Sequence, residues 1–128
     1  MTPGELVAAA RSAATGAYAP YSGFRVGAAV LGRDGRVVTS ANVENAAYPV
    51  SQCAEANAVS YAVSQGVRDI VAVAVACVDA ASVDGAYPCG RCRQIMSEFD
   101  VETVYVTGGD DEVRRHTLDE LLPHRFSF

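Results

Sequence analysis

Apolar residues recur at helical spacing in some segments of this chain and at strand spacing in others, with turn residues between them. The first periodic segment begins at Pro3 and carries apolar side chains three and four positions apart, as in a helix. Thr2 and Glu5 have the spacing of a capping box, and proline suits a first helical position. The segment 19–23, Ala-Pro-Tyr-Ser-Gly, then breaks the helix.

The rest of the chain alternates between β-rich and helical segments. Gly32-Arg33-Asp34-Gly35 is typical of a hairpin turn, and the run 70–78 has no polar face, as in a strand covered on both sides. The expected elements are strands over 24–31 and 37–43, a helix over 53–65 ended by Gly66, a strand over 70–78, a helix over 88–99, strands over 104–107 and 111–117, and a helical turn over 118–122. This order predicts a three-layer α/β/α sandwich with a mixed five-stranded sheet, as one domain over residues 1–128.

Composition limits the class of protein. Of the 128 residues, 50% are hydrophobic and 20% are charged, which suits a chain with its own core and argues against disorder. The longest apolar run is too short to cross a bilayer, and no basic flank with a long apolar run marks a signal peptide. We therefore expect a cytoplasmic protein with no membrane partner.

Charge narrows the partners further. Ten arginines and no lysines stand against 15 acidic residues, which gives a formal net charge of −5. The arginines are scattered, whereas a nucleic-acid binder usually gathers its basic residues in a stripe along the phosphates. The sequence therefore favours a small-molecule substrate and no nucleic-acid partner.

Three of the four cysteines lie in two short motifs, each at the start of an expected helix. The motifs are Cys53-Ala54-Glu55 and Pro88-Cys89-Gly90-Arg91-Cys92. Cys89 and Cys92 are three residues apart and so share a helical face, and the positive end of a helix dipole favours thiolates. Three converging thiolates indicate a zinc site with one open position, which is typical of a catalytic site.

Glu55 lies two residues beyond the first of these ligands, so it is placed beside the open position and not in the ligand set. There it can take a proton from water and pass it on, and the spacing is that of zinc nucleobase deaminases. A lone C-x-x-C also occurs in redox sites and in four-cysteine structural zinc sites. Cys77 is expected to be a core residue, and His116 and His124 fall near turns where surface positions are expected.

Five ordered segments match a known family pattern. They are residues 19–29 (APYSGFRVGAA), residues 42–49 (NVENAAYP), residues 53–55 (CAE), residues 88–94 (PCGRCRQ), and residues 121–123 (LLP) followed by Phe126. In these segments, and along nearly its whole length, the chain resembles the small homotetrameric cytidine deaminases of the zinc-dependent cytidine/deoxycytidylate deaminase superfamily. The resemblance implies the cytidine deaminase fold and a role in pyrimidine salvage.

The resemblance also implies a reaction and a cofactor. The reaction is the hydrolytic deamination of cytidine and 2′-deoxycytidine to uridine and 2′-deoxyuridine. One zinc ion per subunit is implied, held by Cys53, Cys89 and Cys92. Glu55 is implied as the residue that carries protons from the attacking water to N3 of the base and to the leaving ammonia.

Contacts with the substrate follow from the same resemblance. Asn42 and Glu44 match residues that bind the ribose hydroxyls, Phe24 matches one that packs on the base, and the amide of Ala54 helps to orient the reacting atoms. A ribose hydroxyl can donate to a carboxylate and accept from an amide, which suits this pair.

Other matched residues imply active sites shared between subunits of the homotetramer. Ala46 and Tyr48 match positions that reach into a neighbouring subunit's pocket. Phe126 matches an aromatic residue donated across an interface to cover the pyrimidine.

The sequence departs from the family pattern at one point. Many members carry arginine directly after the glutamate, whereas this chain has Ala56 there and carries Arg91 between the two cysteines of the second motif. Arg91 is therefore expected to compensate the thiolate charge at zinc. Blasticidin-type deaminases also resemble P-C-G-R-C, so a deaminase of a modified cytosine nucleoside is one alternative function. A non-enzymatic zinc module is another.

Overall fold

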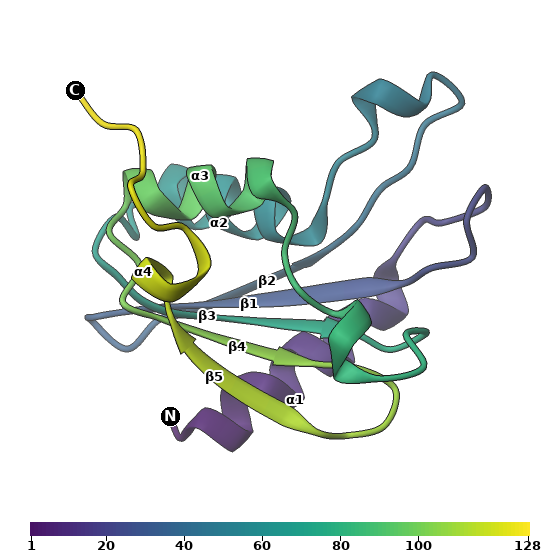
Figure 1. Cartoon of the computed structure of the whole chain (residues 1–128), viewed down its shortest axis with the longest axis horizontal. Coiled ribbons are helices and arrows are strands. Elements are labelled where there is room, and N and C mark those ends of the chain that lie inside the picture. Colours follow the sequence, from purple (N-terminus) through teal and green to yellow (C-terminus); the bar gives the residue numbers. More distant parts are fainter.

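Five strands form one mixed sheet with helices on both faces (Figure 1), and the structure, a computed structural model, describes residues 1–128. The strand order is β2-β1-β3-β4-β5; β3 and β4 are parallel, and the other neighbours are antiparallel. The elements are α1 (Pro3–Ala13), η1 (Ala14–Gly16), β1 (Val26–Gly32), β2 (Val37–Ala41), η2 (Tyr48–Val50), α2 (Ala54–Ser64), β3 (Ile70–Cys77), η3 (Val83–Gly85), α3 (Gly90–Glu98), β4 (Thr103–Thr107), β5 (Val113–Thr117) and α4 (Leu118–Leu121). The expected three-layer sandwich is confirmed.

The central strand β3 is buried on both faces, as its unbroken apolar run predicts. Its side chains alternate across the sheet, so that Ala72, Ala74 and Ala76 face α1 while Val73 and Val75 join the larger core cluster under α2 and α3. Small residues on the α1 side let that helix lie close to the sheet. Strand β3 is therefore covered on both faces of the sheet.

Gly27 on β1 shows how closely α1 approaches. A Cβ atom at this position would lie 1.9 Å from the carbonyl oxygen of Ala10, so no other residue fits.

Gly66 ends α2 as expected, with a φ of +89° that favours glycine. The capping box of Thr2 and Glu5 is also present.

Two strands differ from the expectation at one end: β1 begins two residues later than expected, and β2 ends two residues earlier. Phe24 and Arg25 precede β1 because the amide of Arg25 donates to the Asp79 carboxylate at 2.8 Å instead of to a neighbouring strand. Strand β2 stops at Ala41, before the polar residues Asn42 and Glu44. The short helices η2 and η3 lie in segments for which the sequence predicts neither a helix nor a strand. None of the helices combines the length and apolar character that a membrane span requires.

Candidate active site

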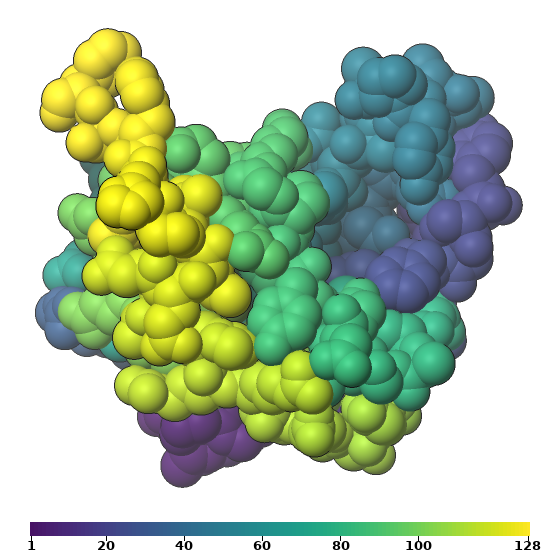
Figure 2. Space-filling model, in the orientation of Figure 1, coloured from purple at the N-terminus to yellow at the C-terminus, as the bar shows by residue number.

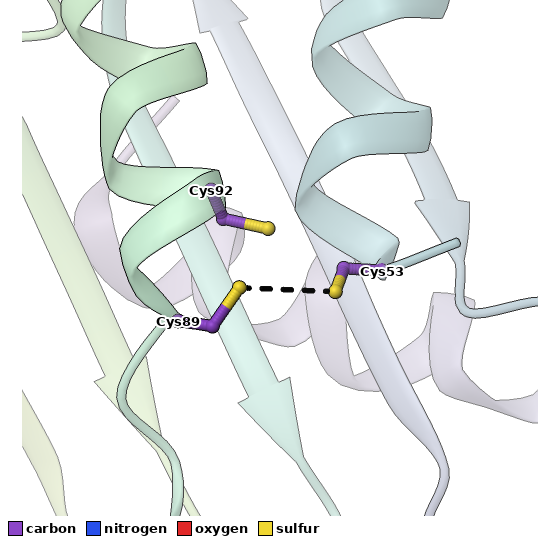
Figure 3. Close-up of side chains that lie close together, drawn as sticks. All are labelled: Cys53, Cys89 and Cys92. Carbon is purple, nitrogen blue, oxygen red and sulfur yellow. Dashed lines mark hydrogen bonds between the residues drawn. The ribbon is translucent and has the colours of Figure 1, made fainter. Parts of the chain in front are cut away.

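Three cysteine side chains at the starts of two helices converge over one face of the sheet (Figure 3). Cys53 immediately precedes α2, Cys89 immediately precedes α3, and Cys92 lies in the first turn of α3. The three sulfur atoms all lie within 4.8 Å of one another, and those of Cys53 and Cys89 are 4.0 Å apart. All three are free thiols. The structure thus brings together the residues that the two sequence motifs single out.

The surroundings of these sulfurs favour a bound cation. Interaction with Cys92 lowers the pKa of Cys53 to about 6, with smaller contributions from Cys89 and from the charge of Arg91. The same interaction, together with burial, raises the pKa of Cys92. One thiolate therefore forms readily, and a second needs a cation to offset its charge. Three thiolates on two helix N-termini fit Zn²⁺, a thiolate-binding ion of tetrahedral preference.

Glu55 lies beside the sulfur cluster and is only 5% exposed. Burial raises the pKa of its carboxyl group to about 7, although hydrogen bonds with its own backbone amide and with Cys92 oppose the rise. A carboxyl group whose pKa lies near neutrality exchanges protons readily in both directions. The geometry and the pKa therefore both suit a group that accepts a proton and later returns it.

A cavity of about 570 Å³ leads from the surface to this cluster. Its size is within the range of pockets that enclose small molecules. Figure 2 shows the surface notched between the segment around η2 and the segment that leads into α3, where this cavity opens. Its lining comes from five stretches of the chain: Ser22, Phe24, Val26, Asn42, Glu44, Tyr48, Ser51, Gln52, Cys53, Ala54, Glu55, Cys77, Gly85, Tyr87 and Cys89.

Glu44 is a buried carboxylate in the wall of the cavity, 6% exposed. The backbone amides of Tyr21 and Ser22 donate to its Oε1 at 3.0 and 3.1 Å, and the Ser22 hydroxyl donates to its Oε2. These bonds, with that of the Ser22 side chain the largest contribution, lower the pKa of Glu44. Tyr48 donates to Oε2 only at 3.4 Å, so a substrate hydroxyl can compete for that oxygen.

Asn42 holds the strand end that carries Phe24. Its Oδ1 accepts from the amide of Val26 at 2.9 Å, and its Nδ2 donates to the carbonyl of Phe24 at 2.8 Å. One amide hydrogen and one lone pair remain for a ligand. The side chain predicted to bind ribose therefore also positions the half-buried Phe24, a use that the sequence does not indicate.

Of the three residues predicted to act across subunits, one lines the cavity and two do not. Tyr48 lines the cavity of its own chain, whereas Ala46 is exposed and does not line it. Phe126 is 66% exposed, packs edge-to-face on Phe128 and also lies outside the cavity lining. The segment around η2 and the C-terminal tail both project from the body of the molecule, on either side of α3 (Figure 1).

Arg91 is exposed and makes no hydrogen bond or ion pair. Its guanidinium does not bond a thiolate sulfur, although its charge contributes to lowering the pKa of Cys53. In this conformation, Arg91 can offset the negative charge of the thiolates only through the electrostatic effect of its own charge and not through a hydrogen bond. Ala56, where the family pattern has arginine, is buried.

The sequence analysis missed two residues beside the cavity, Tyr87 and His116. Tyr87 lines the cavity, and its hydroxyl lies 2.9 Å from Nε2 of His116, which is half-buried and not at the surface as expected. The position of Tyr87, two residues before Cys89, was a sequence signal that could have placed it near the site. The partner His116 could not be found from spacing, because the two residues are separated by 29 positions.

Comparison with known proteins identifies the family. A family model described as the cytidine and deoxycytidylate deaminase zinc-binding region matches residues 2–108. The chain belongs to the cytidine and deoxycytidylate deaminase family. The match includes both cysteine motifs and Glu55.

Relatives within this family are similar over nearly the full chain. A cytidine deaminase of Halalkalibacterium halodurans is 44% identical over 124 residues, which are 95% of this chain and 92% of that protein. A cytidine deaminase of Mycobacterium tuberculosis is 47% identical over 91% of this chain and 84% of its own. The crystal structure of the Burkholderia pseudomallei cytidine deaminase has a TM-score of 0.91 and 40% identity, and the match covers 98% of this chain and 100% of that one.

One relative bears on the alternative function. The blasticidin-S deaminase of Bacillus cereus is 31% identical over 107 residues, which are 80% of this chain and 76% of that protein. It is more distant than the two cytidine deaminases above, at 44% and 47% identity.

Proposed function

We propose that this protein is a cytidine deaminase that hydrolyses cytidine and 2′-deoxycytidine to uridine and 2′-deoxyuridine and releases ammonia. The observation that carries the proposal is the buried Glu55 carboxyl group beside three thiols that lie within 4.8 Å of one another. A buried acid next to a three-thiol cluster provides a proton carrier and a metal site with room for a fourth ligand. These residues act within one catalytic domain, residues 1–128.

The pocket suits a nucleoside from end to end. Glu44 and Asn42 offer a carboxylate and an amide to the ribose hydroxyls at one end, and Phe24 offers an aromatic face to the base. The base then points toward Cys53 and Cys89 at the other end, with the amide of Ala54 helping to orient it. A free base would forgo the polar contacts of the ribose, so nucleosides are the better substrates.

Cys53, Cys89 and Cys92 would hold the zinc ion, one per subunit. Bound there, zinc would supply Lewis acidity that lowers the pKa of the attacking water. Glu55 takes up the proton of the attacking water and delivers it to N3 of the base as the C4–O bond forms. Glu55 then moves the proton of the new C4 hydroxyl to the amino group, and ammonia leaves as the C4 carbonyl forms. Each step needs a carboxyl group that binds and releases a proton near neutral pH, as Glu55 does.

The proposed assembly is a homotetramer with shared active sites. The exposed Phe126, outside the cavity of its own chain, is available to cover the pyrimidine in a neighbouring subunit. Ala46 is exposed, and Tyr48 is 56% exposed although it also lines the cavity of its own chain, so both are available to reach a neighbour's pocket. Reduced cysteines are typical of a reducing compartment, so the cytoplasm is the proposed location. Pyrimidine salvage is the proposed role, as the family resemblance implies.

Substrate comparison tests the proposal against its two alternatives. Arg91 in P-C-G-R-C favours a modified cytosine nucleoside, whereas Asn42 and Glu44 favour ordinary ribose. We expect kcat/KM for cytidine and 2′-deoxycytidine to exceed that for blasticidin S. Turnover of blasticidin S alone would establish the first alternative. Zinc binding without turnover of any cytosine nucleoside would establish a non-enzymatic zinc module.

A further inference from the structure

Tyr87 lines the site cavity, yet the proposed reaction gives it no role. It lies between η3 and α3, two positions before Cys89, and its half-buried ring packs against the larger core cluster. Phe24 and Glu55 line the same cavity. The ring of Tyr87 is therefore part of the wall that a bound substrate meets.

The hydroxyl of Tyr87 is held from outside the cavity by the edge strand β5. It lies 2.9 Å from Nε2 of His116, and Nη1 of Arg114 donates to it at 3.4 Å. The Tyr87 and His116 rings also contact each other, with centroids 5.3 Å apart and planes at 56°. Because both polar partners lie on β5, the hydroxyl points toward that strand and the ring is left to form the wall.

The chain of hydrogen bonds continues to the cap of α4. Nδ1 of His116 lies 3.3 Å from Oε2 of Glu120, whose Oε1 accepts from the amide and hydroxyl of Thr117. With its proton on Nδ1, His116 donates to Glu120 and accepts from Tyr87, so every donor in the chain has an acceptor. Three side chains and a capped helix thus fix the Tyr87 ring in one orientation.

The chemistry of the base indicates which of its atoms meets this wall, and here the inference rests on the proposed function. In a cytosine ring N3 and C5 flank C4 on opposite sides. In Figure 3 the helices α2 and α3 lie side by side, and their starts, with Cys53 on one and Cys89 on the other, flank the sulfur cluster. If N3 faces Glu55 on α2, C5 faces the segment that enters α3, which carries Tyr87.

We propose that Tyr87 is a specificity-determining residue that limits the size of the group at C5 of the base, and that His116 and Glu120 are positioning residues that hold its ring. A wall that is fixed from behind excludes bulk more strictly than one that can swing away. One extra methylene in an apolar pocket changes the ratio of kcat/KM between two substrates by about 10- to 200-fold. Removal of the whole Tyr87 ring should therefore change that ratio by a measurable factor.

The test compares kcat/KM for cytidine and for 5-iodocytidine in the zinc-loaded enzyme. Wild type should disfavour 5-iodocytidine, and Tyr87→Ala should raise the ratio of 5-iodocytidine to cytidine by about 10-fold or more, with unchanged zinc content. Tyr61→Ala is the matched control, because this exposed tyrosine on α2 lies outside the cavity lining, and its ratio should equal that of wild type. If Tyr87→Ala is recovered without zinc, Tyr87→Leu serves instead, since leucine keeps apolar bulk but not the ring.

A double-mutant cycle tests the part played by His116. His116→Ala should raise the same ratio in the wild-type background but not in a Tyr87→Phe background, where the hydroxyl that His116 holds is absent. A general loss of structure would instead lower activity toward both substrates in both backgrounds. An equal effect of His116→Ala in the two backgrounds would overturn its positioning role.

The outcomes separate this inference from the proposed function. An active wild type whose ratio changes less than about 2-fold in Tyr87→Ala, or in Tyr87→Leu, would overturn the C5 wall and leave the deaminase proposal standing. A zinc-loaded wild type that deaminates neither nucleoside would overturn both.

Discussion

The sulfur atoms of Cys53 and Cys89 lie 4.0 Å apart although the residues are separated by 36 positions in the chain. Each residue is the N-cap of a helix, α2 or α3, and neither side chain makes a capping hydrogen bond. The positive ends of two helices thus face one sulfur cluster, and their unfilled amide donors favour thiolates there. The sheet determines this meeting, because both helices pack on the same face of it.

Replacement of Glu55 by glutamine should lower kcat severely without loss of zinc. One acid–base role is worth about 10²–10⁴-fold, and Glu55 acts in both halves of the proposed reaction, so a loss of at least about 10⁴-fold is expected. Ammonia release and zinc content would be measured on the same preparation. Glu98→Gln, at an exposed position on α3, is the control and should be fully active. A Glu55→Gln enzyme that keeps more than a tenth of wild-type turnover would show that the assigned role is wrong.

Removal of the charge of Arg91 should weaken the zinc site. Its positive charge contributes to lowering the pKa of Cys53, so Arg91→Ala should raise that pKa, lower zinc affinity in a chelator competition and reduce turnover. Adding Ala56→Arg to the Arg91→Ala variant should restore part of the zinc affinity and part of the turnover. Arg68→Ala, at an exposed position between α2 and β3, should change neither. Unchanged zinc affinity and turnover in Arg91→Ala would mean that backbone amides alone balance the thiolates.

The link between Arg25 and Asp79 should make stability depend on pH in the acid range. Arg25 donates to Asp79 from its amide at 2.8 Å and from its guanidinium at 2.9 and 2.8 Å, and these bonds lower the pKa of Asp79 to about 2. The unfolded value is about 3.9, so the contribution to stability is complete above that pH and is lost as pH falls through about 2. Urea midpoints should therefore be higher for wild type than for Asp79→Asn at pH 7 and should converge near pH 2. Equal midpoints at pH 7 would show that the link does not stabilise the fold.

Local signals predicted most of the fold. The capping box of Thr2 and Glu5, Gly66 and the apolar run of β3 act within a few residues, and each lies where the sequence places it. The convergence of the three cysteines was also predictable, because both cysteine motifs match the family pattern and each lies at the start of a helix. The bond between Tyr87 and His116 was not, since it depends on β5 pairing with β4. The orientation of Arg91 was not predictable either, because an exposed side chain has no packing to fix it.

Deletion of residues 126–128 should raise KM more than it lowers zinc content. Phe126 is exposed and lies outside the cavity of its own chain, so its proposed role requires a second subunit. Light scattering should give a tetramer, with a mass four times 13.4 kDa, for the active enzyme. A fully active monomer at assay concentration would contradict the shared-site proposal, as would an unchanged KM in the truncated protein.

Zinc titration of the metal-free protein, with cytidine as the substrate, tests whether one zinc ion at the three-cysteine cluster is required for deamination. We expect no turnover without metal, activity that rises linearly and breaks at one zinc per chain, and one ammonia for each uridine formed. Cys92→Ala should lose zinc binding and turnover, whereas Cys77→Ala should still bind one zinc per chain, because Cys77 lies outside the three-sulfur cluster. Full turnover by the metal-free protein, or zinc binding with no ammonia from cytidine, would show that this chain is not a zinc-dependent cytidine deaminase.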